Sequence, residues 1–554
     1  MKTQIANSNA NSHRSNKNNH GRALAVAAVL LSLSVGSVYA QSLSSEAIRQ
    51  SGIGPTSCTL ATGGNICPSP QYRSGAVGTS FNANLSGSPL GDGKVLNNKT
   101  VANLALNATI LAPGGGGCST GSNPTTSPSI ASRVIFPALD STGNCSLFAY
   151  GVVGHSFGWR STISSSPVTS SAGYAGADIY VASEDGNLYA FGYTTGTPDW
   201  VFNPGTGAPF DASPTTWPNL DGVYIIDNGS TGSGIIYKVG ASSGTMDPNW
   251  PGPIYSNVNP GGGNPYGVPA SASSLSVSTC GGFYGACNML FAAGFNNNSG
   301  FGGIVEAYNS ANHNFVWSNT TSLSNAATSS PVVSDKHGLV YVQTTVACGP
   351  VFGQGYQFSG GLIYALDQSN GTENWKATPI DPRGPCPFAR SLTPTQEGTH
   401  LPPAPIGSNI FASGGSPAYD EATNYVIASA VVNYVTSNGQ GITNSQFEYS
   451  ILNVFDAHRC SSNGGNAVCH TYINNPVTGN ASKVTNSSPE VVNGVIYIGT
   501  DDGYVQAYDE STCANLWNST QMDSALLSPP VVSFNRVHAV SQDGTLYVWA
   551  LPGY

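Results

Sequence analysis

The segment from 487 to 517, SSPEVVNGVIYIGTDDGYVQAYDESTCANLW, constrains the fold of this chain more than any other. It contains three short apolar runs, separated by Asn-Gly at 493–494 and Asp-Asp-Gly at 501–503, and a fourth run ends at Trp517. Asn-Gly and Asp-Gly between β-branched and aromatic runs predict tight hairpins, because these residues tolerate a positive φ. The segment therefore predicts a four-stranded antiparallel sheet, which is marginally stable alone and needs similar sheets beside it.

The same pattern recurs along the chain, with one residue, usually small, marking each third strand. The equivalent positions are Ala149, Ala190, Lys238, Ala307, Ala365, Val454, Ala507 and Val548. A tryptophan follows six of them, ten positions later or, after Lys238, twelve; these are Trp159, Trp200, Trp250, Trp317, Trp375 and Trp517. Repeats of this kind bury one another's faces, so these tryptophans are predicted to lie between neighbouring sheets.

Ser-Pro opens most copies, at 127–128, 166–167, 213–214, 330–331, 416–417, 488–489 and 528–529. The repeat spacing starts at about 41 residues, which is the period of four-stranded propeller blades. The copies predict blades at 126–160, 165–202, 212–250, 270–318, 329–376, 415–473, 487–518 and 527–550. The sixth copy is the poorest match, because it has no tryptophan at its end.

The repeat resembles that of the PQQ-like (quinoprotein alcohol dehydrogenase-like) β-propeller family over residues 100–554, most clearly at 165–201, 329–376 and 487–518. In that family the tryptophan of one blade docks against the next blade. The last copy lacks a fourth strand, and the alternating segment 100–111, TVANLALNATIL, can supply it. We therefore predict an all-β, eight-bladed β-propeller of four-stranded antiparallel blades, whose last blade is closed by this N-terminal strand and so has no exposed edge.

The N-terminus predicts export. Basic residues precede an apolar run at 23–33, and small residues end at Ala40, which is the pattern of a secretory signal with cleavage after that residue. The run is too short to anchor the chain in a bilayer, and no later segment is long and apolar enough to span one. The mature protein is expected to be secreted or periplasmic, with a Ser/Gly/Asn-rich appendage at 41–99 before the propeller.

Eleven cysteines in an exported chain suggest disulfides. Short spacing favours three local pairs, Cys58 with Cys67, Cys280 with Cys287 and Cys460 with Cys469. Cys118 with Cys145 and Cys348 with Cys386 are further candidates. Cys513 is then left over, and its place before a fourth strand predicts a buried free thiol.

Long insertions indicate where binding takes place. They fall between the second and third strands of blades 5 and 6, at 343–360 and 432–449, and after blades 3 and 5, at 251–269 and 376–414. In a propeller both classes of link lie on one face, so the insertions predict a loop-rich rim over blades 3 to 6. Long loops on a rigid scaffold are common binding sites.

The candidate ligand or partner residues on this rim are Tyr356, Asp381, Arg383, Arg390, Glu397 and His400. An arginine there suits an anionic ligand, because its planar fork matches carboxylate or phosphate. The alternative is that Asp381 and Arg383 form a local surface pair, which contributes little energy.

The family resemblance also implies a cofactor to test. Quinoprotein alcohol dehydrogenases hold PQQ at the centre of the ring with a calcium ion bound by Glu, Asn and Asp, a catalytic Asp, and a disulfide between adjacent cysteines. No cysteines are adjacent here, and none of these residues can be matched to a position in this sequence. No catalytic or metal-binding residue is therefore assigned.

Two functions remain. The first is an exported, non-catalytic binding or scaffold protein that uses the rim to hold a protein or a cell-surface polysaccharide. The second is a divergent quinoprotein dehydrogenase that binds PQQ and calcium in the central funnel. Only 8% of the residues are charged and the net charge is −10, which argues against nucleic-acid binding, because that needs clustered Lys and Arg.

Overall fold

The computed structural model describes the greater part of the chain from residue 96 onward. The described residues are 96–118, 129–130, 133–152, 154–175, 177–217, 222–229, 233–250, 252–260, 273–278, 288–296, 303–320, 329–351, 355–359, 362–380, 406–413, 415–437, 442–458, 464–485, 487–533 and 535–553. The signal predicted for 1–40 and nearly all of the appendage predicted for 41–99 lie outside them. Within the described part, no helix has the length and apolar character of a membrane span.

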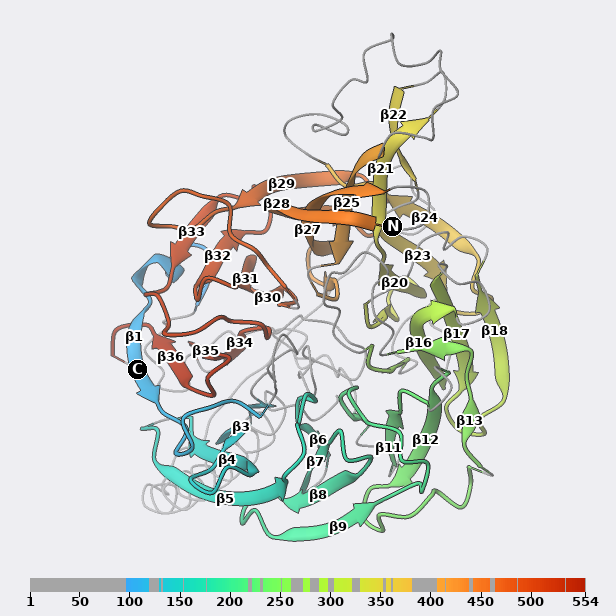
Figure 1. Cartoon of the computed structure of the whole chain (residues 1–554), viewed down its shortest axis with the longest axis vertical. Coiled ribbons are helices and arrows are strands. Elements are labelled where there is room, and N and C mark those ends of the chain that lie inside the picture. The colour runs from blue at the N-terminus through green and yellow to red at the C-terminus, as the bar shows by residue number, and fades with distance from the viewer. Residues whose placement is uncertain are drawn as a thin grey trace, which may run out of the picture. The chain divides into compact units, whose positions relative to one another are not determined.

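The described strands form eight antiparallel sheets, the blades of a propeller (Figure 1). Blade 1 consists of β2 (Ser129–Ile130), β3 (Arg133–Leu139), β4 (Cys145–Gly151) and β5 (Phe157–Ser164), and blade 2 consists of β6 (Gly173–Ala175), β7 (Asp178–Ala182), β8 (Leu188–Gly192) and β9 (Pro198–Phe202). Blade 3 consists of β10 (Thr215–Trp217), β11 (Gly222–Ile226), β12 (Ile235–Gly240) and β13 (Ile254–Tyr255). Blade 4 consists of β15 (Ser276–Val277), β16 (Met289–Asn296), β17 (Gly303–Asn309) and β18 (Phe315–Asn319), and β14 (Val258–Asn259) pairs with the end of β16.

Blades 5 to 8 continue the ring. Blade 5 consists of β19 (Val332–Ser334), β20 (Leu339–Gln343), β23 (Ile363–Asp367) and β24 (Glu373–Ala377), and blade 6 consists of β26 (Ala418–Asp420), β27 (Tyr425–Ser437), β28 (Ile442–Asp456) and β29 (Ala467–Ile473). Blade 7 consists of β30 (Glu490–Val492), β31 (Val495–Gly499), β32 (Val505–Asp509) and β33 (Asn515–Asn518). Blade 8 consists of β34 (Val531–Ser533), β35 (Arg536–Val540), β36 (Leu546–Ala550) and β1 (Ala105–Ile110). Three more strands, β21 (Val346–Val351), β22 (Gly355–Ser359) and β25 (Ile406–Ser413), extend the sheet of blade 6.

The two ends of the propeller segment close the ring, as predicted. β1 pairs antiparallel with β36, from Ala105 opposite Ala550 to Ile110 opposite Leu546. A 3-10 turn, η1 (Val101–Asn103), precedes β1 within the predicted closing segment. The eighth blade is thus assembled from strands more than 400 residues apart in sequence, and its order β1-β36-β35-β34 gives it four strands.

Serine hydrogen bonds link the innermost strands of successive blades. The backbone N–H of each serine donates to the hydroxyl Oγ of the next, at 2.7 to 3.0 Å, in the order Ser171, Ser213, Ser274, Ser330, Ser416 and Ser488. This role explains why serine opens the repeat. The prediction that Ser166-Pro167 opens blade 2 is wrong, because Ser171, followed by alanine, occupies that position; Ser274 does so in blade 4 without a proline.

The repeated tryptophans dock against the next blade, as predicted. The indole Nε1 of Trp159 donates to the carbonyl of Tyr193 at 2.9 Å, and Trp200 and Trp317 make the same bond to the carbonyls of Ala241 and Gln368. Each ring covers a glycine at positive φ in the turn before the next blade's last strand, such as Gly371 (φ +71°) beneath Trp317. A side chain at these glycines would occupy the space of the indole.

Three predictions about cysteines are wrong. Cys469 forms a disulfide with Cys513 and not with Cys460, so Cys513 is not a free thiol. Cys118 and Cys145 are buried free thiols, and the Sγ of Cys145 donates to the carbonyl oxygen of Cys118 at 3.4 Å. The other predicted pairs involve side chains outside the described ones.

A buried carboxyl pair crosses the seam between blades 6 and 7. Asp420, at the end of β26, and Glu510, after β32, are 1% and 2% exposed and hydrogen-bonded to each other. The hydroxyl of Thr423 donates to Glu510 Oε1 at 2.8 Å. Burial, and then the charge of Asp420, raise the pKa of Glu510 to about 9. The seam therefore holds a protonated carboxyl at neutral pH.

This pair predicts a pH-dependent stability. The pKa of Glu510 is raised by folding, so its contribution is complete below pH 4.5 and is lost as the pH rises toward about 9. Each unit of pH in that window removes up to about 1.4 kcal/mol from the free energy of unfolding. We expect Glu510→Gln to make the free energy of unfolding depend less on pH, by the equivalent of one bound proton. Urea unfolding at pH 5, 7 and 9 measures this dependence.

Asp509→Asn is the matched control. Burial raises the pKa of Asp509, but hydrogen bonds from Ser511, Asn98 and Thr512 outweigh it and hold the pKa below its usual value. Its own contribution therefore changes only at acid pH. The charge of Asp509 raises the pKa of Glu510 less than burial and the charge of Asp420 do, so the variant should keep most of the wild-type slope between pH 5 and 9. An unchanged slope in Glu510→Gln would show that the seam does not hold a proton.

Candidate binding rim

The predicted rim residues are only partly within the described structure. Tyr356 lies on β22, whose backbone is described. Asp381, Arg383, Arg390, Glu397 and His400 lie outside the described residues, so their proposed roles remain predictions. The site is therefore built from the strands that carry the insertions.

Three of the four predicted insertions join in one sheet. Its strand order is β22-β21-β25-β27-β28-β29. β21 and β22 belong to the insertion in blade 5, and Cys348 on β21 lies opposite both Phe358 on β22 and Asn409 on β25. β25 comes from the link after blade 5, and Ile410 on it lies opposite Asn433 on β27. Insertions from two blades and the link between them are thus held together by backbone hydrogen bonds.

The insertion predicted as a loop at 432–449 is instead a long hairpin. β27 and β28 run for 13 and 15 residues and remain paired from Tyr425 opposite Asp456 to Ser437 opposite Ile442. We call the distal parts of β27 and β28, residues 431–437 and 442–449, together with β21, β22 and β25, the rim sheet. Figure 1 shows β21 and β22 projecting beyond the ring of blades.

The rim sheet is anchored in the core of its blade. Val346 at the start of β21, and Val431 and Val432 on β27, are fully buried. Tyr449 on β28 is 4% exposed, and its ring packs edge-on against Tyr472 with centroids 5.3 Å apart. The base of the sheet is therefore fixed to the propeller, as a binding surface on a rigid scaffold requires.

The fourth insertion lies at the same end of its blade. β14, in the link after blade 3, pairs with the end of β16, where Val258 lies opposite Asn296. That end of β16 leads into the link between the second and third strands of blade 4. The register therefore supports the predicted clustering of insertions on one face over blades 3 to 6.

The described links on this face are acidic. Between second and third strands, and between blades, they carry nine carboxylates and one lysine: Asp140, Glu184, Asp185, Asp211, Asp227, Asp501, Asp502, Asp523, Asp543 and Lys483. Burial raises the pKa of Asp211, and burial together with the charge of Asp211 raises that of Glu184. We call these residues the acidic links. Asp140 and Asp227 are buried, at 2% and 0% exposed, so the other seven carboxylates are the ones that can favour a basic partner.

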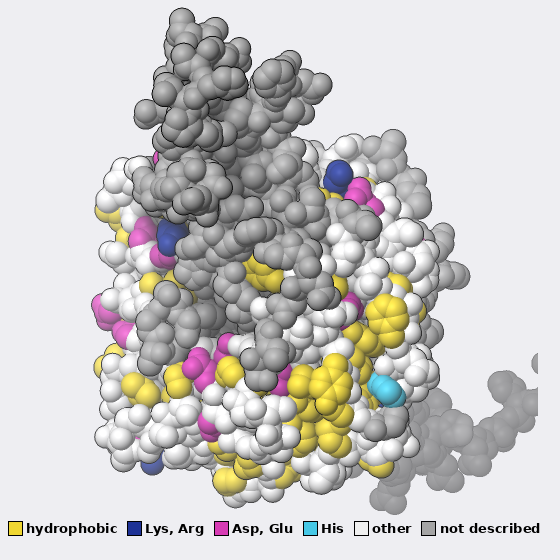
Figure 2. Space-filling view, turned by 45° about the vertical axis from the view of Figure 1, so that its right-hand side comes forward, with side chains coloured by type: hydrophobic (Ala, Val, Ile, Leu, Met, Phe, Trp, Pro, Cys, Tyr) yellow, Lys and Arg dark blue, Asp and Glu magenta, His cyan; other side chains and the backbone are white. Residues whose placement is uncertain are grey.

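Figure 2 shows few Lys and Arg side chains on the face in view and a patch of hydrophobic side chains on the wall of the ring. Exposed apolar residues of the described outer strands include Tyr255 on β13 and Phe315 on β18, at 77% and 58%. Both belong to outer strands of adjacent blades. Isolated apolar residues on outer strands are common, and they do not mark a site.

Among the described residues, no group of three or more His, Cys, Asp or Glu side chains is placed to hold a metal ion.

The long strands β27 and β28 were predicted as a loop in their distal parts, although the sequence contains a signal for them. YVIASAVVNYV at 425–435 and FEYSILNVF at 447–455 carry the β-branched and aromatic residues of long strands.

A protein-family model described as outer membrane protein assembly factor BamB matches residues 121–376 and 460–551. No curated protein matches the sequence. Among solved structures, a quinohemoprotein alcohol dehydrogenase from Comamonas testosteroni is 13% identical over 88% of this chain and 80% of that chain, with a TM-score of 0.57. A europium-containing methanol dehydrogenase is 13% identical over 86% and 89%, with a TM-score of 0.53. BamB from Moraxella catarrhalis is 16% identical over 81% and 99%, with a TM-score of 0.47.

At these identities the solved structures establish the fold alone. The family model, in contrast, matches more than half of the chain. The residues between its two matched parts, 377–459, contain β25 and the long hairpin of β27 and β28. Most of the rim sheet therefore lies outside the part of the chain that the family model matches. Its repeats and the family match together show that the chain belongs to the PQQ-like β-propeller family, which includes the assembly factor BamB.

Proposed function

We propose that the chain is an exported, non-catalytic binding or scaffold protein that holds a protein partner through the rim sheet. The observation that carries this proposal is the joining of three insertions into one sheet anchored on the ring. The family model is named for an assembly factor, which supports a role in protein binding. The acidic links favour a partner with a basic surface, and complementary charge steers association. The disulfide supports an oxidising compartment, secreted or periplasmic.

Site-specific photo-crosslinking tests this proposal. A photoreactive residue is placed at Gln446, which is exposed on β28 at the rim sheet, and in a separate variant at Asn515, which is exposed on β33 in the outer wall. We expect one protein to crosslink at Gln446 but not at Asn515, with a yield that falls as salt is raised from 50 to about 500 mM. Equal yields at both positions, or crosslinks to polysaccharide alone, would contradict a protein-binding rim.

The alternative, a quinoprotein dehydrogenase, has its own readout. PQQ and calcium are added to the purified chain, and the bound quinone spectrum and dye-linked alcohol oxidation are measured. The family contains such enzymes, but the donor residues of their calcium site have no match here. Both signals together would overturn the non-catalytic assignment.

A further inference from the structure

Blade 6 has a cysteine at the position where blades 1, 2, 4, 5 and 7 have a tryptophan. In blades 1, 2, 4, 5 and 7 the docking tryptophan lies opposite the small residue of the third strand, as Trp375 lies opposite Ala365. In blade 6 that small residue is Val454, and Cys469 lies opposite it. The strand pairing therefore places Cys469 at the position that the docking tryptophan occupies in those blades.

Its partner occupies the position against which a tryptophan would dock. The turn before each last strand contains a residue at positive φ, four residues before the tryptophan in most blades. Gly196 (φ +70°) precedes Trp200 in this way, and Gly371 (φ +71°) precedes Trp375. In blade 7 the residue is Cys513 (φ +55°), four positions before Trp517. His155 (φ +50°) and His313 (φ +60°) occupy the equivalent position in blades 1 and 4, so this turn accepts a residue with a side chain.

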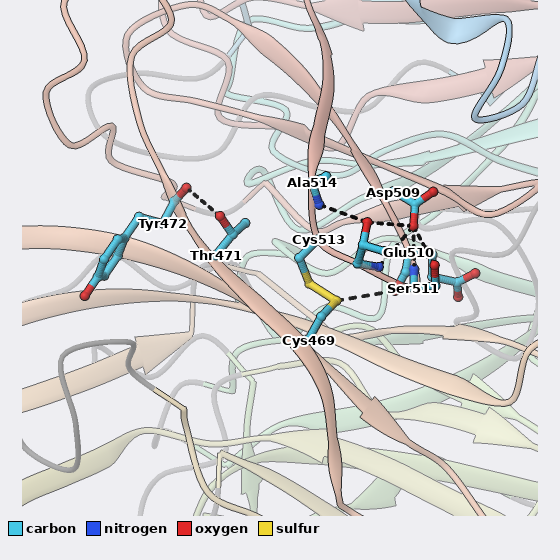
Figure 3. The surroundings of a disulfide bond; sticks show 9 residues. Cys469, Thr471, Tyr472, Asp509, Glu510, Ser511, Cys513 and Ala514 are labelled. Atoms are coloured by element: carbon cyan, nitrogen blue, oxygen red, sulfur yellow. Dashed lines mark hydrogen bonds between the residues drawn. A yellow bond between two sulfur atoms is a disulfide. The ribbon is translucent and has the colours of Figure 1, made fainter.

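The two cysteines are bonded across the seam. Their Cα atoms are 5.7 Å apart, and the bond joins residues separated by 44 positions. Figure 3 shows the disulfide beside Glu510, whose carbonyl oxygen lies 3.5 Å from Cys469 Sγ. The sulfur atoms pack in a cluster with Val454, Val484 and Tyr508, which spans blades 6 and 7.

We propose that this disulfide is a covalent replacement for the tryptophan clamp and makes the seam between blades 6 and 7 the redox-sensitive joint of the ring. Two thiols fill far less space than an indole, so without the bond this seam has neither the ring contact nor the indole hydrogen bond that Trp159, Trp200 and Trp317 make at their seams. The seam also carries the Asp420–Glu510 pair, and blade 6 supplies β27 and β28 of the rim sheet. The joint therefore lies in the blade that carries the proposed binding surface.

The bond forms by thiol–disulfide exchange with an external disulfide. The thiolate of one cysteine attacks that disulfide and displaces a thiolate, and the second cysteine then attacks the mixed disulfide. Two protons and two electrons leave the pair, and the external disulfide is reduced to two thiols. Reduction of the joint is the reverse reaction.

Two forms of the chain test the proposal. The first is the wild type, and the second is Cys469→Trp/Cys513→Gly, which rebuilds the clamp found elsewhere and keeps all other cysteines. Both are treated with a phosphine reductant, thiol release is verified by mass spectrometry, and limited proteolysis is followed by peptide mapping. We expect reduction to speed cleavage around β29 and β33 of the wild type roughly 30-fold, from the usual stabilisation by a disulfide. The rebuilt variant should be unaffected.

The outcomes separate the proposal from its alternatives. If the reduced wild type resists cleavage as well as the oxidised form does, the proposal that the seam is redox-sensitive is overturned. Equal sensitivity of both forms would place the effect at another disulfide and would also overturn it. If the rebuilt variant does not fold, Cys469→Ser/Cys513→Ser is compared with the wild type, and resistance to cleavage in this variant contradicts the proposal.

Discussion

Replacing Gly371 with alanine is expected to lower the free energy of unfolding by about 2–5 kcal/mol. Gly371 has a φ of +71°, and an alanine there is strained by about 1 kcal/mol. The added Cβ would also overlap the six-membered ring of Trp317, which is 6% exposed and donates to the carbonyl of Gln368. Overpacking of this kind typically costs about 1–3 kcal/mol, and loss of the indole hydrogen bond adds to it.

Gly494→Ala is the matched control. Gly494 has a φ of +77° in the hairpin between β30 and β31, and an added Cβ there would meet nothing within 4 Å. The control carries the strain of the positive φ without the collision, so the difference between the two variants measures the tryptophan contact. Urea unfolding followed by tryptophan fluorescence gives both values. Equal losses would mean that docking of Trp317 contributes little to the seam.

Local chemistry made the blades predictable. Asn493-Gly494 and Asp502-Gly503 fix two hairpins of blade 7 by backbone conformation alone, and Gly494 and Gly503 do adopt positive φ. Tryptophan spacing then revealed the repeat, and the missing fourth strand of the last copy pointed to residues 100–111. Each of these inferences needs only residues close in sequence or a count of strands.

Contacts between blades were not predictable in the same way. Short spacing suggested Cys460 with Cys469, but Cys469 lies at a position that faces the next blade, so it meets Cys513 instead. The strand register that decides this is known only when Val454 is seen opposite Cys469. The rim sheet was missed for a related reason, because its strands come from separate insertions and pair only in three dimensions.

Blade 3 shows how a departure from the repeat is compensated. Lys238 replaces the usual small residue, and its ammonium lies 2.5 Å from Asp247 Oδ2, with the two side chains 6% and 9% exposed. Asp247 lies in the turn before Trp250, where blade 3 has two residues more than the other blades. The ammonium also lies 5.8 Å from the ring centre of Tyr224 and 5.9 Å from that of Trp250. Blade 3 therefore carries both the unusual lysine, Lys238, and the aspartate that neutralises it, Asp247.

Lys238→Met is expected to lower the free energy of unfolding by about 3–5 kcal/mol, because it leaves Asp247 buried without its partner. Burial raises the pKa of Asp247, but the ion pair with Lys238 outweighs it and holds the pKa below its usual value. In the variant this balance is reversed, so the loss should be largest at neutral pH and should shrink as the carboxyl is protonated at acid pH. Urea unfolding at pH 4 and 7 measures both effects.

The double variant Lys238→Met/Asp247→Asn separates the charge from the packing. Methionine keeps most of the aliphatic volume of lysine, and asparagine keeps the shape of aspartate without its charge. If the loss in Lys238→Met comes from an unpaired buried carboxylate, the double variant should recover most of it and lose its dependence on pH. If both variants are equally destabilised at pH 7, the lysine supports the blade through its contacts with Tyr224 and Trp250, and neutralising Asp247 is not its role.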